Sequence, residues 1–292
     1  MSNYFSVIFL APQRAVTYTT YKKIRSYHVK EQDNQMLDIR YEDEALLVVN
    51  KPPGILIHPT TTEDENSLAT LIKNYYQERG WILNLHPVSR LDRYTSGLVV
   101  FAKFPEIQGI LIKQGMQKEY LALVTGTLPA DHGIIDTPIA RKPGSIIERE
   151  VNPDGKPCKT EYWVIANHVI SNKTDRKVNK NICDTGLLRL SPQIREHASN
   201  ISGEPLSLVR CRLYTGRTHQ IRVHFASIGC PLWHDNLYGK IPGPPQRHGL
   251  HSYKLSFIHP WTGVKLEVIS MLPGDMTAAW DGKFSDSDSY DY

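Results

Sequence analysis

Short apolar runs separated by turn-forming residues constrain the fold of this chain more than any other feature of its sequence. Helical spacing of apolar residues occurs at residues 67–76 and 219–228. Because strand-like runs outnumber these helices and no regular alternation of the two is visible, the sequence predicts an α+β fold with a mostly antiparallel sheet. The strand-like runs lie at residues 45–49, 98–102, 119–125, 160–165 and 206–214.

The second helical segment, residues 219–228, has the clearer boundaries. Thr218 is its expected N-cap, and Gly229 ends it. Ile221 and Phe225 share one face, which we expect to be buried. Arg222 lies about 100° from Ile221, at the edge of that face. An arginine in this position can reach into a neighbouring site.

The chain divides into three parts by composition. Residues 1–40 form an extension, in which Lys22, Lys23, Arg25 and Lys30 lie among tyrosines. We interpret this extension as a strand or two added to the main sheet; because basic residues interleaved with aromatic ones are typical of nucleic-acid contacts, an RNA-contacting arm is the alternative. Residues 41–272 form the predicted catalytic domain. Within it, the polar residues 170–205 are expected to be an insertion or long loop. Residues 273–292 are read as a C-terminal tail whose acidic, serine-rich end is disordered.

Charge and cysteine content place few limits on function. The chain has 34 basic and 30 acidic residues, so its net charge of +4 permits nucleic-acid binding through a local patch without requiring it. Its four cysteines form no Cys-x-x-Cys pair and are expected to be free thiols in a reducing compartment. With no recognisable signal peptide and no apolar run of about 20 residues, we expect a cytoplasmic protein that does not enter a membrane.

The most informative local pattern surrounds Asp92. This acidic residue sits between Arg90 and Arg93 and is followed by the small residues of a tight loop, Thr95-Ser96-Gly97, and then by the predicted strand 98–102. A carboxylate among arginines is expected to be ionised at neutral pH. Such a group suits a nucleophile that acts on a polyanion, because the arginines can bind phosphates. A loop aspartate that only caps backbone amides is the structural alternative.

Four motifs in the chain resemble the RluA-type pseudouridine synthase family. The Asp92 segment, residues 88–98, resembles the family signature Arg-Leu-Asp-x-x-Thr-Ser-Gly-Leu. One position departs from it, because the family usually has histidine where this chain has Ser89. The other three motifs occur in the family's order at residues 50–54 (NKPPG), 118–126 (KEYLALVTG) and 215–224 (TGRTHQIRVH).

The resemblance implies a bent mixed sheet in two halves with a central catalytic cleft. It also implies isomerisation of uridine in ribosomal or transfer RNA after the base is flipped out of its stack. Asp92 would be the nucleophile, Arg222 its basic partner, and Tyr120 the aromatic ring that stacks under the target base. Arg90 would fill the gap left by the flipped base or bind phosphate.

Further binding residues and partners follow from the same resemblance. Arg93 and Arg217 are expected to bind substrate, and Leu255 either walls the pocket or packs in the core. Arg210 and Arg212 are expected to join these arginines in one basic cleft. The reaction needs no metal or redox cofactor, and His219 and His224 lie about 140° apart on a helix, which is unsuitable for sharing a metal. We expect a monomer.

Other classes of function stay open at this point. An RNA-binding protein could keep this fold and lack catalysis. A hydrolase could use Asp92 on a nucleoside or sugar, and would then release free base. A two-carboxylate glycosidase would need a partner for Asp92, for which Glu119 is the candidate.

Overall fold

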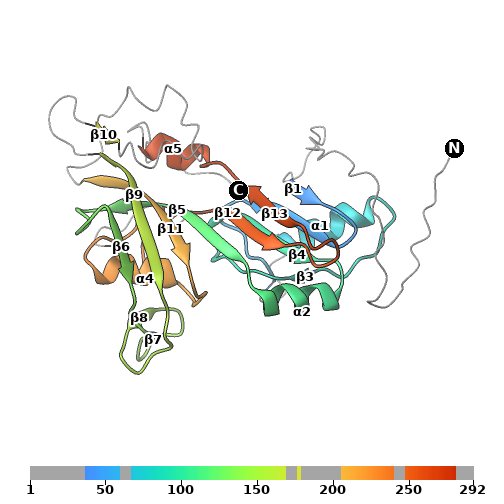
Figure 1. Ribbon diagram of the computed structural model, residues 1–292, viewed down its shortest axis with the longest axis horizontal. Helices are drawn as coiled ribbons and strands as arrows, with labels where there is room; N and C mark the ends of the chain where they lie inside the picture. Colours follow the sequence, from blue (N-terminus) through green and yellow to red (C-terminus); the bar gives the residue numbers. More distant parts are fainter. Residues whose placement is uncertain (1–36, 60–66, 169–175, 179–204, 240–246, 281–292) are drawn as a thin grey trace.

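The computed structural model describes residues 37–59, 67–168, 176–178, 205–239 and 247–280, and its centre is an eleven-stranded sheet. Helices flank this sheet, so the predicted α+β fold is confirmed (Figure 1). The order across the sheet is β1 (Asp38–Glu42), β2 (Leu46–Lys51), β4 (Ser96–Ala102), β12 (Leu250–Ile258), β5 (Gln117–Thr125), β11 (Leu206–Leu213), β9 (Thr160–His168) and β10 (Arg176–Val178). Three strands branch from this path, namely β13 (Lys265–Ile269) on β12, β3 (His86–Pro87) on β4 and β6 (His132–Ile135) on β9.

The two halves of the sheet meet at β12. Among the described strands, β12 and β4 form the one parallel pair, and the other pairings are antiparallel. Gly97 lies opposite Ser252 in this pair, with φ +109°, and a Cβ at Gly97 would collide with the Ser252 backbone. The Thr-Ser-Gly sequence after Asp92 therefore has a structural cause, because only glycine fits at this junction.

In the half formed by β1, β2 and β4, the sheet is buried on both faces. Alternate residues of β2 point to opposite sides: Leu46 and Val48 join a cluster with α2 (Pro105–Gln114), whereas Leu47 and Val49 join one with α1 (Leu68–Gln77). Burial on both faces explains why this strand is a continuous apolar run. The Ser67 side chain caps α1 by accepting a hydrogen bond from the Thr70 amide.

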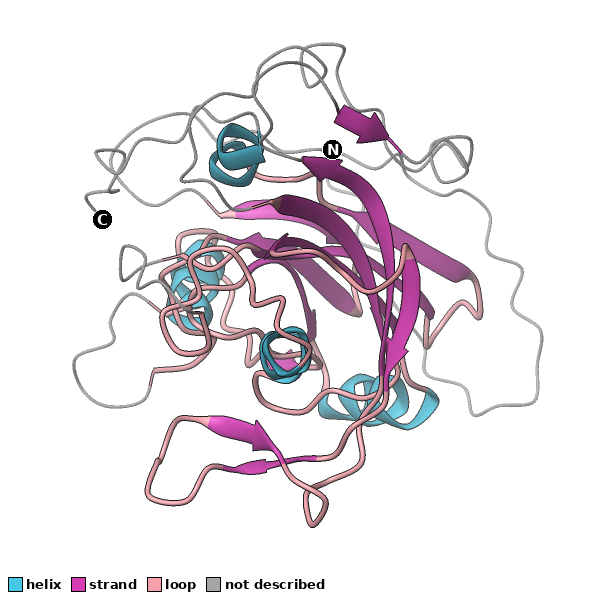
Figure 2. Ribbon diagram, turned by 90° about the vertical axis from the view of Figure 1, so that its left-hand side faces the viewer, coloured by secondary structure: helices cyan, strands magenta, loops and turns pink. Residues whose placement is uncertain are grey.

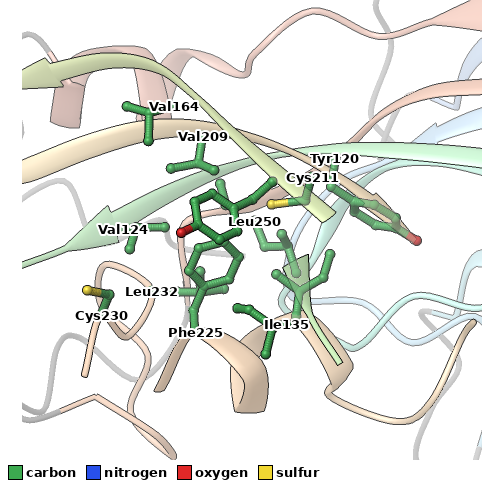
Figure 3. Packing of buried hydrophobic residues seen from close by; sticks show 13 residues of the cluster. Tyr120, Val124, Ile135, Val164, Val209, Cys211, Phe225, Cys230, Leu232 and Leu250 are labelled. Carbon is green, nitrogen blue, oxygen red and sulfur yellow. The ribbon is translucent and has the colours of Figure 1, made fainter. Parts of the chain in front are cut away.

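The other half is also covered on both faces. Even-numbered residues of β5, including Tyr120 and Val124, pack with α4 (Gln220–Ser227), whose Phe225 lies beneath the strands in Figure 3. Leu121 and Leu123 face the opposite side and pack with α5 (Gly274–Trp280). The helix α5 thus belongs to the core, although these residues were assigned to the C-terminal tail on the sequence alone.

A separate hairpin projects from this half of the molecule. It consists of β7 (Ile139–Arg141) and β8 (Arg149–Val151), which form a two-stranded sheet at the edge of the view in Figure 2. The sequence of residues 129–155 is rich in turn-forming residues and does not predict these strands. Residues 1–36 and most of the expected insertion at 170–205 lie outside the described residues.

The start of α4 differs from its prediction. Thr218 is exposed, and His219 occupies the N-cap position with a left-handed backbone, φ +58°. The turn is held by Gln220, which accepts hydrogen bonds from the Thr215 hydroxyl and the Arg217 amide. The N-cap residue makes no capping hydrogen bond with its side chain, so the cap expected from Thr218 is absent and Gln220 stabilises the preceding turn instead. Ile221 and Phe225 are buried as predicted.

Candidate active site

Asp92 lies in the turn that leads into β4. Its backbone carbonyl accepts a hydrogen bond from the Thr95 amide, and its side chain is 27% exposed. The buried Lys51 ammonium, at the end of β2, donates to the carbonyls of Pro52, Ile55 and Arg93. The 50–54 motif therefore has a structural role, because its lysine anchors the turn that carries Asp92.

Arg222 is the cation beside Asp92, as the sequence predicted. Its Nη1 lies 3.4 Å from Asp92 Oδ2, although the two residues are 130 positions apart in the chain. The Arg222 side chain is 5% exposed and projects from α4. Both described contacts of the Asp92 carboxylate, with Arg222 and His219, are made by Oδ2. Among the described residues, Oδ1 has no partner and is available to a substrate.

Asp235 holds Arg222 in place, and sequence reasoning missed it. Its two oxygens each accept a 2.8 Å hydrogen bond from Arg222, and its side chain has no exposed area. Oδ1 also accepts from the amides of Leu237 and Tyr238. Hydrogen bonding and charge from Asp235 raise the pKa of Arg222 against the effect of burial. The guanidinium is therefore a fixed cation whose remaining nitrogen points to Asp92.

His219 is a second residue that the sequence did not assign to the site. Its Nε2 lies 3.8 Å from Asp92 Oδ2, and its Nδ1 lies 2.8 Å from the Tyr238 hydroxyl. Burial lowers its pKa, so the imidazole is neutral at pH 7. His219, three residues before Arg222, and His234, directly before Asp235, are the two non-glycine residues with positive φ in the described part of the chain. Backbone strain of this kind clusters at functional sites.

Tyr120 belongs to β5 and is 6% exposed. Its ring packs at the edge of the core cluster, and its hydroxyl points away from the other labelled side chains in Figure 3. That hydroxyl is hydrogen-bonded to Ser252 of β12. Burial and the nearby Asp92 charge raise the Tyr120 pKa, so the phenol is protonated at neutral pH.

A further set of polar contacts supports the Asp92 turn from the C-terminal part of the chain. Thr95 is hydrogen-bonded to the buried His248, whose pKa is far below its usual value because of burial. Arg247 donates to the Tyr94 carbonyl and forms a buried ion pair with Asp275 at the start of α5. Ser89, which replaces the family's usual histidine, is buried and accepts a hydrogen bond from the Val100 amide.

The predicted arginines do not form one basic surface. Arg90, Arg93 and Arg217 are exposed. In contrast, Arg210 and Arg212 project from the face of β11 opposite α4, where they pair with Glu119 and lie over the Trp163 ring. The expectation that these two arginines share a cleft with Asp92 was wrong. Strand alternation separates them from Cys211, which faces the α4 side.

Two other candidates are placed away from Asp92. Leu255 is 1% exposed and packs in the core cluster with Leu98 and Phe257, so it fits the core-packing alternative. Glu119 pairs with the two arginines on the opposite face and does not accompany Asp92 as a second carboxylate. The described residues contain no group of three or more His, Cys, Asp or Glu side chains that could hold a metal ion. None of the described helices is long and apolar enough to cross a bilayer.

The fold and this site together define an enzyme centred on a single carboxylate, with a buried guanidinium, a protonated phenol and a neutral imidazole around it. The RNA pseudouridylate synthase family model matches residues 45–227. The chain belongs to this family, and its reaction class is the isomerisation of uridine in RNA to pseudouridine.

Individual relatives agree with this assignment. A Bacillus subtilis protein named "Uncharacterized RNA pseudouridine synthase YjbO" is 36% identical over 251 residues, which are 85% of this chain and 76% of that protein. The Escherichia coli (strain K12) "Ribosomal large subunit pseudouridine synthase D" is 31% identical over 258 residues, covering 82% of this chain and 68% of that one. The solved structure of "Human RNA Pseudouridylate Synthase Domain Containing 1" has the same fold, with a TM-score of 0.62 at 22% identity over 88% and 91% of the two chains.

Proposed function

We propose that this pseudouridine synthase isomerises specific uridines in ribosomal or transfer RNA, with Asp92 as its nucleophile. The observation that carries the proposal is the asymmetry of the Asp92 carboxylate. Oδ2 is held by Arg222, while Oδ1 has no partner among the described residues. A carboxylate fixed through one oxygen presents the other to a reacting atom.

The surrounding groups suit the steps of the reaction. The C–N glycosidic bond breaks, the detached uracil turns, and a C–C bond forms between its C5 and C1′ of the ribose; C5 then loses its proton and N1 gains one, so the product is an isomer of the substrate. Tyr120 offers an aromatic face for the detached base, since base–aromatic stacking contributes about 1–3 kcal/mol. Arg90, Arg93 and Arg217 are exposed and can contact phosphates, while Arg93 also donates to the Gly54 carbonyl and Arg217 to the Pro157 carbonyl. Names of relatives such as the Escherichia coli protein favour large-subunit ribosomal RNA as the substrate.

Substituting Asp92→Asn tests the nucleophile. The amide keeps the size of the side chain and can still accept from Arg222, so we expect unchanged thermal stability and loss of tritium release from RNA that contains 5-tritiated uridine. Glu267→Gln, which alters an exposed carboxylate that pairs with Lys254 and Lys265, is the matched control and should keep full activity. Activity of Asp92→Asn within tenfold of the wild type would contradict the proposal.

Mapping of pseudouridine tests the substrate. Cells with and without the gene are compared by carbodiimide treatment and primer extension of their RNA. A position in ribosomal or transfer RNA that loses its modification supports the proposal, and loss confined to other RNAs contradicts it. Release of free uracil from the same RNA would instead indicate a hydrolase.

A further inference from the structure

A chain of hydrogen bonds leads from the β7–β8 hairpin to Asp92. The Arg149 amide of β8 donates to the Tyr238 hydroxyl oxygen at 2.9 Å. The same hydroxyl lies 2.8 Å from His219 Nδ1, and His219 Nε2 lies 3.8 Å from Asp92 Oδ2. The His219 side chain is 11% exposed, so it borders the site and is not part of the core.

Counting protons along this chain fixes the state of His219. The Tyr238 oxygen accepts from the Arg149 amide, and in the described part of the structure His219 Nδ1 is the one acceptor within reach of the Tyr238 proton. If Nδ1 carried the imidazole proton, the Tyr238 oxygen would accept twice and its own proton would have no partner, which is costly for a half-buried group. The neutral imidazole therefore carries its proton on Nε2, the nitrogen that faces Asp92.

The position of Nε2 is suited to a ligand. A distance of 3.8 Å from Asp92 Oδ2 exceeds that of a normal hydrogen bond, so this N–H is not satisfied by the carboxylate. The backbone of His219 is left-handed, with φ +58°, a conformation that is uncommon outside glycine and is often found at functional sites. Its neighbours include the Asp92 carboxylate before β4, Arg222 on α4, Asp235 and Tyr238 in the following turn, and Arg149 on β8.

We propose that His219 is a substrate-binding residue, which donates a hydrogen bond from Nε2 to an oxygen of the nucleotide beside Asp92, and that the Tyr238 hydroxyl fixes the tautomer that makes this possible. The inference rests on the proposed function, because it places the nucleotide at Asp92. It adds a hydrogen-bond donor, His219 Nε2, next to the Asp92 carboxylate. The β7–β8 hairpin contributes through the Arg149 amide, which orients the Tyr238 hydroxyl toward His219. Tyr238 is thus a positioning residue.

Three variants separate donation from mere packing. His219→Gln can place an amide N–H near the position of Nε2. His219→Asn tolerates the left-handed backbone but is too short to donate there. Tyr238→Phe keeps the ring, which lies 5.1 Å from the Arg222 guanidinium, and removes only the hydroxyl. Single-turnover rates on saturating RNA are measured from pH 6 to pH 8.5, with thermal melting as the check on folding.

We expect His219→Asn to slow the reaction about 2- to 12-fold, the effect of one lost hydrogen bond, and His219→Gln to retain most of the rate. Tyr238→Phe should be slowed more at pH 8.5 than at pH 6. Without the hydroxyl, the neutral ring can place its proton on Nδ1, and Nε2 then accepts and no longer donates; this neutral form dominates at pH 8.5. Imidazole ¹⁵N shifts, assigned by comparison with His219→Asn, should show the Nε2–H tautomer in the wild type and a mixture in Tyr238→Phe.

The inference is overturned if His219→Asn and Tyr238→Phe stay within twofold of the wild type at every pH. It is also overturned if Gln and Asn at position 219 are equally slow, or if the wild-type ring carries its proton on Nδ1. A wild-type enzyme that forms no pseudouridine in any RNA would reject the proposed function, while the ¹⁵N measurement would still decide the tautomer.

Discussion

The buried pair between Arg222 and Asp235 allows the sharpest prediction about stability. Substituting Asp235→Asn removes one negative charge and places an amide N–H₂ against the guanidinium. Asp235 has no exposed side-chain area and Arg222 has 5%, so water cannot replace the lost carboxylate. Asp92, 3.4 Å away and partly exposed, is the remaining counter-charge.

Breaking a buried ion pair by removing one partner costs about 3–5 kcal/mol, because the other charge stays buried and uncompensated. Two hydrogen bonds of 2.8 Å to Arg222 and two from backbone amides place Asp235 within that range. For a domain of this size, such a loss lowers the melting temperature by about 6–20 °C.

Urea denaturation followed by tryptophan fluorescence measures the free energy of unfolding of Asp235→Asn, since the chain has five tryptophans. Glu267→Gln, at the exposed ion pairs of β13, is the control and should lose less than about 1 kcal/mol. A loss below about 1 kcal/mol in Asp235→Asn would refute the reasoning, because it would mean that Arg222 does not depend on this carboxylate.

Three further predictions concern other parts of the same structure. Tyr120→Phe should retain most activity and Tyr120→Ala should lose about 5- to 150-fold in single-turnover rate, because stacking needs the ring; equal losses would assign the role to the hydroxyl. Gly97→Ala should lose activity and several kcal/mol of unfolding free energy, because the new Cβ collides with the Ser252 backbone. The control Gly144→Ala, at a positive φ in open space, should lose about 1–2 kcal/mol in urea titrations, and similar losses in the two variants would contradict the argument. Burial lowers the pKa of His251 from 6.5 to about 4, so between these pH values the unfolded state binds a proton that the folded state does not. The free energy of unfolding should therefore fall by about 3 kcal/mol as the pH drops from 6.5 to 4, and a urea midpoint that stays constant over this range would disprove it.

The sequence predicted the strands β2, β4, β5, β9 and β11, which are long apolar runs, but it did not predict the central strand β12. Asp92 and Arg222 were placed together by resemblance, and the structure brings them within 3.4 Å. Asp235 was missed because it lies 13 residues beyond Arg222, after the end of α4, and no local pattern marks an ion pair formed across such a turn. His219 was considered only as a metal ligand and rejected, because the contacts that place it in the site, with Tyr238 and Asp92, join positions 19 and 127 residues away in the chain.

The arginines of β11 show a different kind of error. Arg210 and Arg212 were grouped with the catalytic arginines because they lie near them in sequence. The alternation of side chains along β11 shows that these two arginines share one face, because they are two residues apart. Cys211, between them, lies on the other face and is buried against α4. Which face carries the site depends on α4 and β5, and that information is not local.

The central position of β12 has a consequence for how the protein is made. This strand lies between β4 and β5, and Thr95 meets His248 across 153 residues of chain. Until the ribosome has completed β12, both neighbours have an open edge that can pair with other chains. Contacts so distant in sequence also slow folding, because a long loop must close before any of them forms. We therefore expect truncated or nascent chains to be inactive and prone to aggregation, and to depend on chaperones until the last strands are made.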